Sequence, residues 1–161
     1  MTDTLVIYYS FTGNSKKVAE YAKEKTGADI LELEPKIPFS DDYDTVVEEW
    51  QNNEIKRDVE IKEVNIDLSK YKKIVLITCT WWYGISPVMK KFLKDYDLSG
   101  KDIIVASSNA GWIGHCFRDY KTLLPNSNII GELDLLFSVN EGERDKMLTT
   151  WKDIDSWIEK L

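Results

Sequence analysis

The stretch TLVIYYSFTGNSKKVAEYAKEK (residues 4–25) joins a strand-like run to a helix-like run through a short polar junction. Its first seven residues are mostly apolar and rich in β-forming side chains. After the junction, Val18, Ala19 and Ala22 recur at helical spacing among charged residues, and Gly27 fits the end of a helix. Direct passage from a strand into a helix is typical of α/β folds, so this stretch sets the expectation for the rest of the chain.

The remainder of the chain repeats this alternation. Helix-like runs include one that Asp41 or Asp42 would cap and one with Pro87 in its first turn. A last helix is expected over residues 142–161, with Leu148 and Trp151 among the apolar side chains that pack on the sheet. The further strand-like runs occupy residues 28–35, 72–80, 101–109 and 128–138.

Five strands alternating with helices predict an α/β fold, a three-layer sandwich around a five-stranded parallel sheet, formed as a single domain over residues 1–161. The run at 72–80 is almost continuously apolar, as expected of a central strand covered on both faces. The run at 28–35 alternates apolar and acidic residues, which suits an edge or near-edge strand. Such sheets bind ligands beyond the carboxyl ends of their strands, so the loops after the strands are the places to look for a site.

The composition of the chain excludes several kinds of function. It carries 28 acidic and 21 basic residues, a formal net charge of −7, which would repel nucleic acid but attract a partner with a basic docking face. One histidine and two scattered cysteines, Cys79 and Cys116, exclude a multi-histidine metal site, a zinc site and a disulfide framework. No secretory signal is visible and the longest apolar run is too short to span a bilayer. We therefore expect a cytoplasmic protein without membrane insertion.

The first strand-end loop is a polar junction with several hydroxyl groups. Ser10, Thr12 and Ser15 surround Gly13 immediately before the helix. A helix N-terminus leaves backbone N–H groups unpaired and favours an anion, so this loop suits a phosphate monoester that is held and not transferred. The glycine- and lysine-containing phosphate loop of NTP-binding proteins and the dinucleotide glycine fingerprint are both absent. The alternative is a plain helix cap formed by Asn14 or Ser15.

The second and third strand-end loops suit a flat ring. In TWWYG (residues 80–84), neighbouring rings face opposite ways, so one tryptophan is expected in the core while another ring stacks on a ligand. Gly84 would permit unusual backbone angles or a peptide flip. The loop SSNAGWIG (residues 107–114) is small, polar and glycine-rich, which suits backbone contacts with the edge of a heteroaromatic ring. Together the three loops predict a phosphorylated, planar, heteroaromatic ligand.

These motifs resemble the flavodoxin family, most closely the short-chain flavodoxins. The likeness rests on YYSFTGNSKKVAEYA and TWWYGISPVMKKFL, with further echoes in DDYD, LSGKDIIVASSNAGWIGHCFRDYKTLLP and IIGELDL. It extends over almost the whole chain. The resemblance implies a flavodoxin-like fold with strand order 2-1-3-4-5 and a non-covalently bound FMN.

The resemblance also implies which residues meet FMN. The first loop would hold the phosphate, the second would lie against the isoalloxazine, and the third would border its pyrimidine edge. The chain departs from the family pattern at Thr80, where relatives often have proline, and at Trp112, a bulky residue that would cover the flavin or narrow substrate access. The residues carried over are Ser10, Phe11, Thr12, Gly13, Asn14, Ser15, Thr80, Trp81, Trp82, Tyr83, Gly84, Ser108, Asn109, Gly111, Trp112 and Gly114.

The resemblance implies an electron carrier that cycles FMN between its oxidised, semiquinone and hydroquinone states and meets a redox partner protein as a monomer or weak dimer. A backbone carbonyl near Gly84 is expected to stabilise the semiquinone. One alternative is an FMN-dependent NAD(P)H oxidoreductase acting on quinones or similar small acceptors. Another is a binding module that has lost FMN. No catalytic side chain and no metal are expected. His115 either faces solvent at the start of a helix or lies near the flavin.

Overall fold

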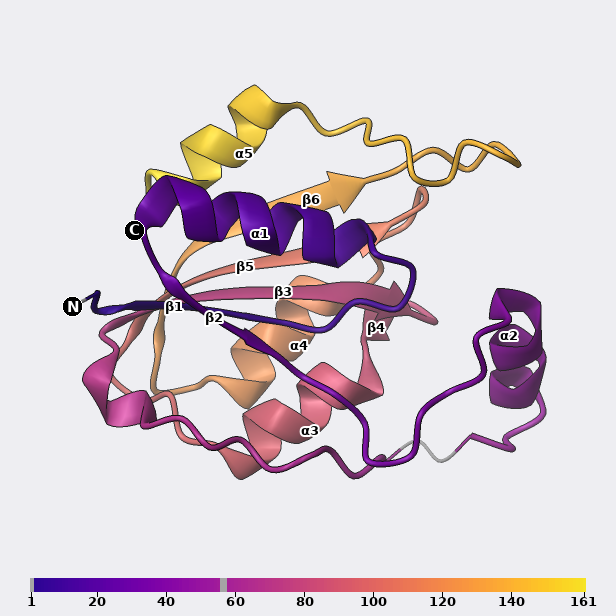
Figure 1. The fold of residues 1–161 in the computed structure, drawn as a ribbon, viewed down its shortest axis with the longest axis horizontal. Coiled ribbons are helices and arrows are strands. Elements are labelled where there is room, and N and C mark those ends of the chain that lie inside the picture. Colours follow the sequence, from indigo (N-terminus) through magenta and orange to yellow (C-terminus); the bar gives the residue numbers. More distant parts are fainter. Residues whose placement is uncertain (1, 56–57) are drawn as a thin grey trace.

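The computed structural model describes residues 2–55 and 58–161, which form a parallel sheet with helices on both faces (Figure 1). The parallel strands stand in the order β2-β1-β3-β5-β6. Numbered among themselves along the chain, these strands have the expected order 2-1-3-4-5, so the predicted fold class is confirmed. Their bounds are Thr4–Tyr8 for β1, Asp29–Glu32 for β2, Lys73–Trp81 for β3, Asp102–Asn109 for β5 and Asn128–Leu136 for β6.

The sheet has one strand that the sequence did not predict. A short strand, β4 (Gly84–Ile85), runs antiparallel to the end of β3, pairing Gly84 with Trp81 and Ile85 with Thr80. β3 therefore extends past the predicted end at residue 80 and turns back on itself. This hairpin lies at the carboxyl edge of the sheet, where the predicted site also lies (Figure 1).

Helices cover both faces of the sheet. α1 (Asn14–Thr26) and α5 (Trp151–Ile158) lie on one face, while α3 (Pro87–Asp95) and α4 (Cys116–Leu123) lie on the other (Figure 1). α2 (Tyr43–Gln51) stands beyond the carboxyl ends of the strands, and a 3-10 helix, η1 (Leu68–Lys70), precedes β3. The helix-end signals in the sequence are confirmed. Gly27 ends α1 with φ 68°, Asp42 caps α2, and Pro87 opens α3.

The core consists of two layers because successive strand residues face opposite sides of the sheet. In β3, Ile74 and Leu76 pack toward α3 and α4, whereas Val75 and Ile77 pack toward α1 and α5. All four side chains are fully buried, so β3 is the covered central strand that its apolar sequence predicted. β2 is an edge strand, as predicted, and its terminal residues Asp29 and Glu32 are exposed.

The last helix is shorter than predicted. Residues 142–150 do not form its first turns, because this part of the chain returns along β6. The N–H of Leu148 donates to the carbonyl of Leu136 (2.8 Å), and Met147 forms an isolated bridge with Phe137. The hydroxyl of Thr150 then caps α5. The prediction that Leu148 and Trp151 are buried is wrong, since 50% and 41% of their surfaces are exposed.

Candidate functional site

The N-terminus of α1 has no side-chain cap. Gly13 occupies the N-cap position with φ 98°, and it has no side chain that could accept a hydrogen bond from the N–H groups of the first turn. The first helical bond runs from the N–H of Lys17 to the carbonyl of Gly13 (3.1 Å). Among the described residues, the N–H groups of Asn14, Ser15 and Lys16 therefore have no acceptor. The plain-cap alternative is wrong, and these donors at the positive end of the helix fit an anion.

The three hydroxyl groups of this loop have different roles. Ser10 Oγ accepts the N–H of Gly13 (3.1 Å) and shapes the turn. Ser15 Oγ is buried and donates to the carbonyl of Thr78 (2.9 Å). Thr12 is exposed and makes no hydrogen bond within the described part of the chain. The prediction that Ser15 directs its hydroxyl toward a phosphate is therefore wrong, although its N–H faces the anion position as a free donor.

Arg144 lies beside the first loop and was not predicted. Asn14 Nδ2 donates to the backbone carbonyl of Arg144 (3.2 Å), which ties the β6–α5 loop to the start of α1. The Arg144 guanidinium lies 5.6 Å from the centre of the Tyr43 ring, and that ring lies 6.2 Å from the ring of Phe11. A cation from the far end of the sequence thus reaches the neighbourhood of the anion site. Its only sequence signal is a lone arginine within the acidic run EGERD.

The second loop is the tight turn of the β3–β4 hairpin. Trp82 and Tyr83 are its two turn residues, with φ 41° and 67°. Both adopt left-handed backbone angles, which are unfavourable for residues other than glycine. Gly84 has no positive φ and lies in β4, which corrects the expectation that it supplies the unusual angles. A Cβ on Gly84 would stand 2.8 Å from Asp119 Oδ2 and 2.9 Å from His115 Cε1. Glycine is therefore needed there for close packing.

The two tryptophans of this loop face different surroundings, as predicted. Trp81 is 8% exposed and packs among the rings of Phe11, Phe39 and Trp50. Trp82 is 38% exposed and stacks on Trp50, with 5.8 Å between ring centroids and 27° between ring planes. Trp81 is thus part of the core and Trp82 part of the surface.

Tyr83 and Trp112 bring the second and third loops together. Their ring centroids lie 4.7 Å apart with the planes tilted by 58°, and both rings are largely exposed. The N–H of His115 donates to the carbonyl of Tyr83 (2.6 Å). A Cβ on Gly114 would overlap that carbonyl oxygen, so only glycine fits. The Tyr83 carbonyl, next to Gly84, thus accepts a hydrogen bond from His115, and the expected role of a carbonyl near Gly84 toward the flavin stays a prediction.

Several side chains predicted for the site are instead bonded within the protein. Thr80 Oγ1 bonds to Ser107 Oγ (2.8 Å), and Ser108 Oγ bonds to Ser15 Oγ (2.9 Å). Asn109 Oδ1 accepts the N–H of Gly111 (3.0 Å), while its Nδ2 donates to Asp134 Oδ1 (2.5 Å). These groups shape the loop ends from inside. The side chains of Thr80, Ser108 and Asn109 are thus bonded within the protein, whereas Gly111 and Trp112 remain exposed. Contact of these residues with a ligand stays a prediction.

A family model described as Flavodoxin matches residues 3–160. The chain belongs to the flavodoxin family. None of the curated proteins compared with the chain matches it. The expected family is thus confirmed over nearly the full length of the sequence.

Solved structures of flavoproteins share the flavodoxin fold of this chain. A candidate flavoprotein from Bacteroides eggerthii DSM 20697 is 21% identical, with a TM-score of 0.75 over 99% of this chain and 97% of the other. A flavoprotein from Lactobacillus acidophilus NCFM, solved in complex with FMN, is 22% identical, with a TM-score of 0.68 over 98% and 99%. Flavodoxin 2 from Bacillus cereus is 18% identical, with a TM-score of 0.54 over 99% and 97%. At these identities the likeness concerns the fold.

Outside the three loops, we looked at the described residues of this flavodoxin-family chain for a metal site and for reactive thiols. Residues 2–55 and 58–161 contain no group of three or more histidine, cysteine or acidic side chains placed to hold a metal. Burial raises the pKa of the Cys79 thiol to about 11 and also raises the pKa of the Cys116 thiol, so both thiols stay protonated. Within the same residues, no helix is both long and apolar enough to cross a membrane.

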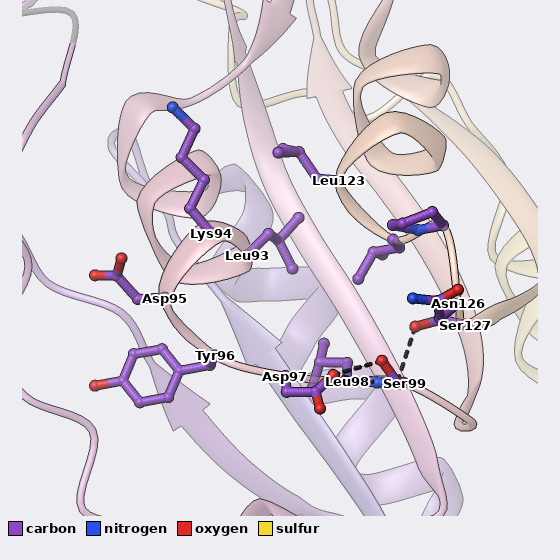
Figure 2. Close-up of a pocket in the computed structure, with 12 residues that line it drawn as sticks. Leu93, Lys94, Asp95, Tyr96, Asp97, Leu98, Ser99, Leu123, Asn126 and Ser127 are labelled. Atoms are coloured by element: carbon purple, nitrogen blue, oxygen red, sulfur yellow. Dashed lines mark hydrogen bonds between the residues drawn. The ribbon is translucent and has the colours of Figure 1, made fainter.

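A cavity of about 280 Å³ lies at the opposite edge of the flavodoxin sheet (Figure 2). The segments before β5 and β6 line it, at the amino ends of these strands. Two of its hydroxyl groups are bonded within the protein: Ser99 Oγ donates to Asp97 (2.5 Å) and Ser127 Oγ donates to the carbonyl of Leu98 (2.8 Å). It is remote from the three loops, and ligands of such sheets bind at the carboxyl edge, so we assign it no function.

Proposed function

We propose that this protein is an electron carrier that binds FMN non-covalently at the carboxyl edge of its sheet. The observation that carries the proposal is the uncapped N-terminus of α1, where three adjacent N–H groups have no acceptor among the described residues of a flavodoxin-family chain. FMN supplies the redox chemistry when it is bound, and the protein supplies binding, orientation and electrostatics.

The phosphate would be held by the N–H groups of Asn14, Ser15 and Lys16, with the Thr12 hydroxyl and the Arg144 cation nearby. Gly13 supports this arrangement because a Cβ built on it meets nothing within 4 Å, so the approach to the donors is open. Neutral donors and a helix end hold an anion without a buried counter-charge. Such a site would allow a protein of net charge −7 to hold an anionic cofactor.

The flavin ring would be held by the exposed rings of Tyr83 and Trp112, which come from the two loops flanking the site. Stacking of aromatic rings contributes roughly 0.5–1.5 kcal/mol beyond the burial of area, and it excludes water from the ring faces. We favour a carrier over an NAD(P)H oxidoreductase because the sequence contains no nicotinamide-binding fingerprint.

The partner would be a redox protein with a basic docking face. Two acidic segments flank the proposed site, residues 41–49 and 141–145, and most of their carboxylates are exposed. Complementary charge steers such encounters and increases their rate. The two unbridged thiols, Cys79 and Cys116, suit a cytoplasmic location, and we expect a monomer or weak dimer in solution.

Reconstitution with FMN tests this function. A carrier should bind FMN, gain thermal stability from it, and bind riboflavin, which lacks the phosphate, about tenfold or more weakly. Its flavin absorbance should bleach with NADPH only after a reductase is added. Bleaching by NADPH alone would instead support the oxidoreductase. Colourless protein that gains no stability from FMN would show that this member of the family has lost the cofactor.

A further inference from the structure

A second cleft, of about 400 Å³, opens between α3, α4 and the β3–β4 hairpin. This volume falls in the range of small-ligand sites. Trp50 of α2 and Trp82 of the hairpin form an aromatic wall, and they stack on each other at 5.8 Å. Lys90, His115 and Asp119 contribute the charged and polar lining.

This cleft shares Trp81, Trp82 and Gly84 with the second loop, but it includes neither Tyr83 nor Trp112, the two rings proposed to hold the flavin. Trp82 and Tyr83 are neighbours in one turn, yet Trp82 lines the cleft whereas Tyr83 packs on Trp112. The anion site at the start of α1 contributes no residue to the cleft lining. The hairpin turn therefore stands between two sites, and a ligand in the cleft would bind independently of FMN.

The imidazole of His115 has a fixed orientation at the cleft. Its Nδ1 bonds to Asp119 Oδ1 (2.8 Å), and Asp119 Oδ2 accepts the N–H of Ile85 (3.1 Å). Each oxygen of the Asp119 carboxylate has a hydrogen-bond partner within the protein. Asp119 therefore orients the imidazole ring and is not itself proposed to contact a ligand. The second ring nitrogen, Nε2, makes no hydrogen bond within the described part of the chain. It is available to a ligand, as an acceptor when neutral or as a donor when protonated.

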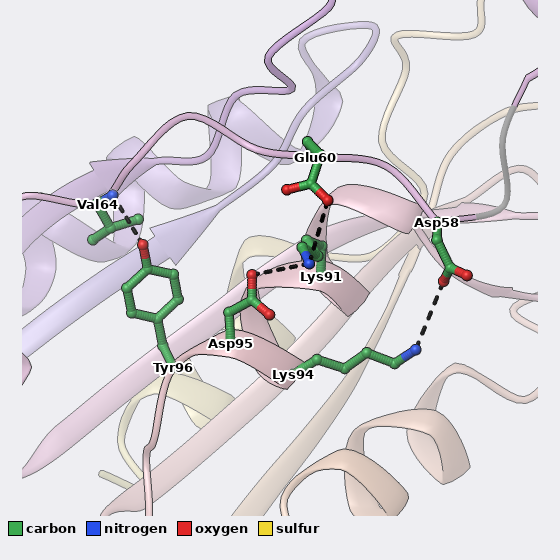
Figure 3. Close-up of polar contacts among 7 residues, drawn as sticks. All are labelled: Asp58, Glu60, Val64, Lys91, Lys94, Asp95 and Tyr96. Atoms are coloured by element: carbon green, nitrogen blue, oxygen red, sulfur yellow. Dashed lines mark hydrogen bonds and ion pairs between the residues drawn. The ribbon is translucent and has the colours of Figure 1, made fainter.

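Lys90 differs from the other lysines of α3. Lys91 pairs with Glu60 (3.6 Å) and Asp95 (3.2 Å), and Lys94 pairs with Asp58 (3.7 Å), as Figure 3 shows. Lys90 forms no ion pair among residues 2–55 and 58–161 and lies at the cleft instead. A lone surface lysine is usually only solvated. Here it stands beside two indole rings and an oriented imidazole, and its charge is opposite to that of most of the protein surface.

We propose that this cleft binds a small planar aromatic carboxylate. Its ring would pack on Trp50 and Trp82, its carboxylate would pair with Lys90, and His115 Nε2 would bond to a polar atom of the ligand. Apolar walls with a few oriented polar groups are the usual construction of a small-molecule site. The positive charge of Lys90 selects an anion over a neutral compound of the same shape.

Calorimetric titration with 2-naphthoate, on the full chain with and without FMN, tests the proposal. We expect a Kd of about 0.1–1 mM, as befits so small a ligand, and the same Kd in the presence of FMN. Neutral 2-naphthamide should bind about fivefold or more weakly. Lys90→Gln should weaken 2-naphthoate binding by a similar factor, whereas Lys94→Gln, on the same helix but outside the cleft, should leave it unchanged.

Three results would overturn the proposal: no heat of binding at millimolar 2-naphthoate, equal binding by Lys90→Gln and the unaltered protein, or competition between 2-naphthoate and FMN. Trp82→Leu provides a second test, because loss of the ring should weaken both naphthyl compounds and not the carboxylate alone. Titration without FMN measures binding to the cleft even if the protein proves not to bind FMN. Thermal melting of each variant verifies that it is folded.

Discussion

The backbone N–H of His115 lies 2.6 Å from the carbonyl oxygen of Tyr83 and donates a hydrogen bond to it. This bond ties the β3–β4 turn to the β5–α4 loop, the two loops proposed to hold the flavin ring. The preceding residue, Gly114, has φ 63°, and a Cβ there would overlap the same oxygen. The spacing of the two loops thus depends on the absence of one methyl group.

Gly114→Ala should separate the two loops. We expect it to lower the free energy of unfolding by about 2–4 kcal/mol, since an alanine adds a clash to an unfavourable backbone angle. It should also weaken FMN binding by about tenfold or more. Gly100→Ala is the matched control, because Gly100 also has a positive φ (77°) but no atom within 4 Å of its Cβ position. Urea unfolding and flavin titration of both variants measure the difference. Equal effects would show that the contact with Tyr83 is unimportant.

Ser15→Ala should lower the stability of the fold, whereas Thr12→Ala should lower the affinity for FMN. The buried Ser15 hydroxyl serves the Thr78 carbonyl and the Ser108 hydroxyl, so its loss should destabilise the fold by about 1–2 kcal/mol. FMN affinity should change little, because only the backbone N–H of Ser15 faces the phosphate position. Thr12 is exposed, so Thr12→Ala should keep its stability within about 0.5 kcal/mol and weaken FMN binding instead. Chemical unfolding and FMN titration, done on both variants, separate the two roles.

The order of strands and helices along the chain was predictable, because the burial of one face of each element leaves a periodic pattern of apolar residues in the sequence. The apolar run of β3 reflects its burial on both faces, and the glycine after α1 reflects the positive φ at the end of that helix. Both signals lie within the element that they predict. The start of α5 was predicted wrongly for a non-local reason. Residues 146–149 satisfy backbone groups of β6, an edge strand, and this pairing prevails over the helical spacing of Leu148 and Trp151.

The part of the site formed by backbone groups was predictable from the sequence. The positions of side chains that depend on contacts between distant residues were less predictable. The free N–H groups at α1 follow from the strand-to-helix junction. Ser15 was misassigned although it continues the buried stripe of Val18, Ala19 and Ala22, as its spacing shows. Arg144 could not be placed, because its contact with Asn14 spans 130 residues of sequence.

Alkaline pH should destabilise the protein through its buried tyrosines. Burial, reinforced by Glu32, raises the pKa of Tyr8 from 10.0 to about 12, and burial also raises the pKa of Tyr120. The folded state therefore holds these protons more tightly than the unfolded chain. The contribution of Tyr8 to stability is fully present below pH 10 and is lost as the pH rises through about 12, the raised pKa of its hydroxyl. Unfolding free energies measured from about pH 8 upward should fall above pH 10, and less steeply in Tyr8→Phe. A flat profile would contradict the prediction.

Arg144→Gln should reveal whether the β6–α5 loop contributes to phosphate binding. The guanidinium stands over Tyr43, and the backbone of the same residue is bonded to Asn14 at the start of α1. An exposed cation near a dianion contributes about 1 kcal/mol, so FMN affinity should fall by about fivefold, more at low salt than at high salt. Riboflavin, which lacks the phosphate, should bind the variant and the unaltered protein equally. Arg118→Gln, an exposed arginine on α4, is the charge-matched control and should leave both ligands unaffected. If riboflavin and FMN weaken together, Arg144 acts by holding the loop in place and not through the charge of its side chain.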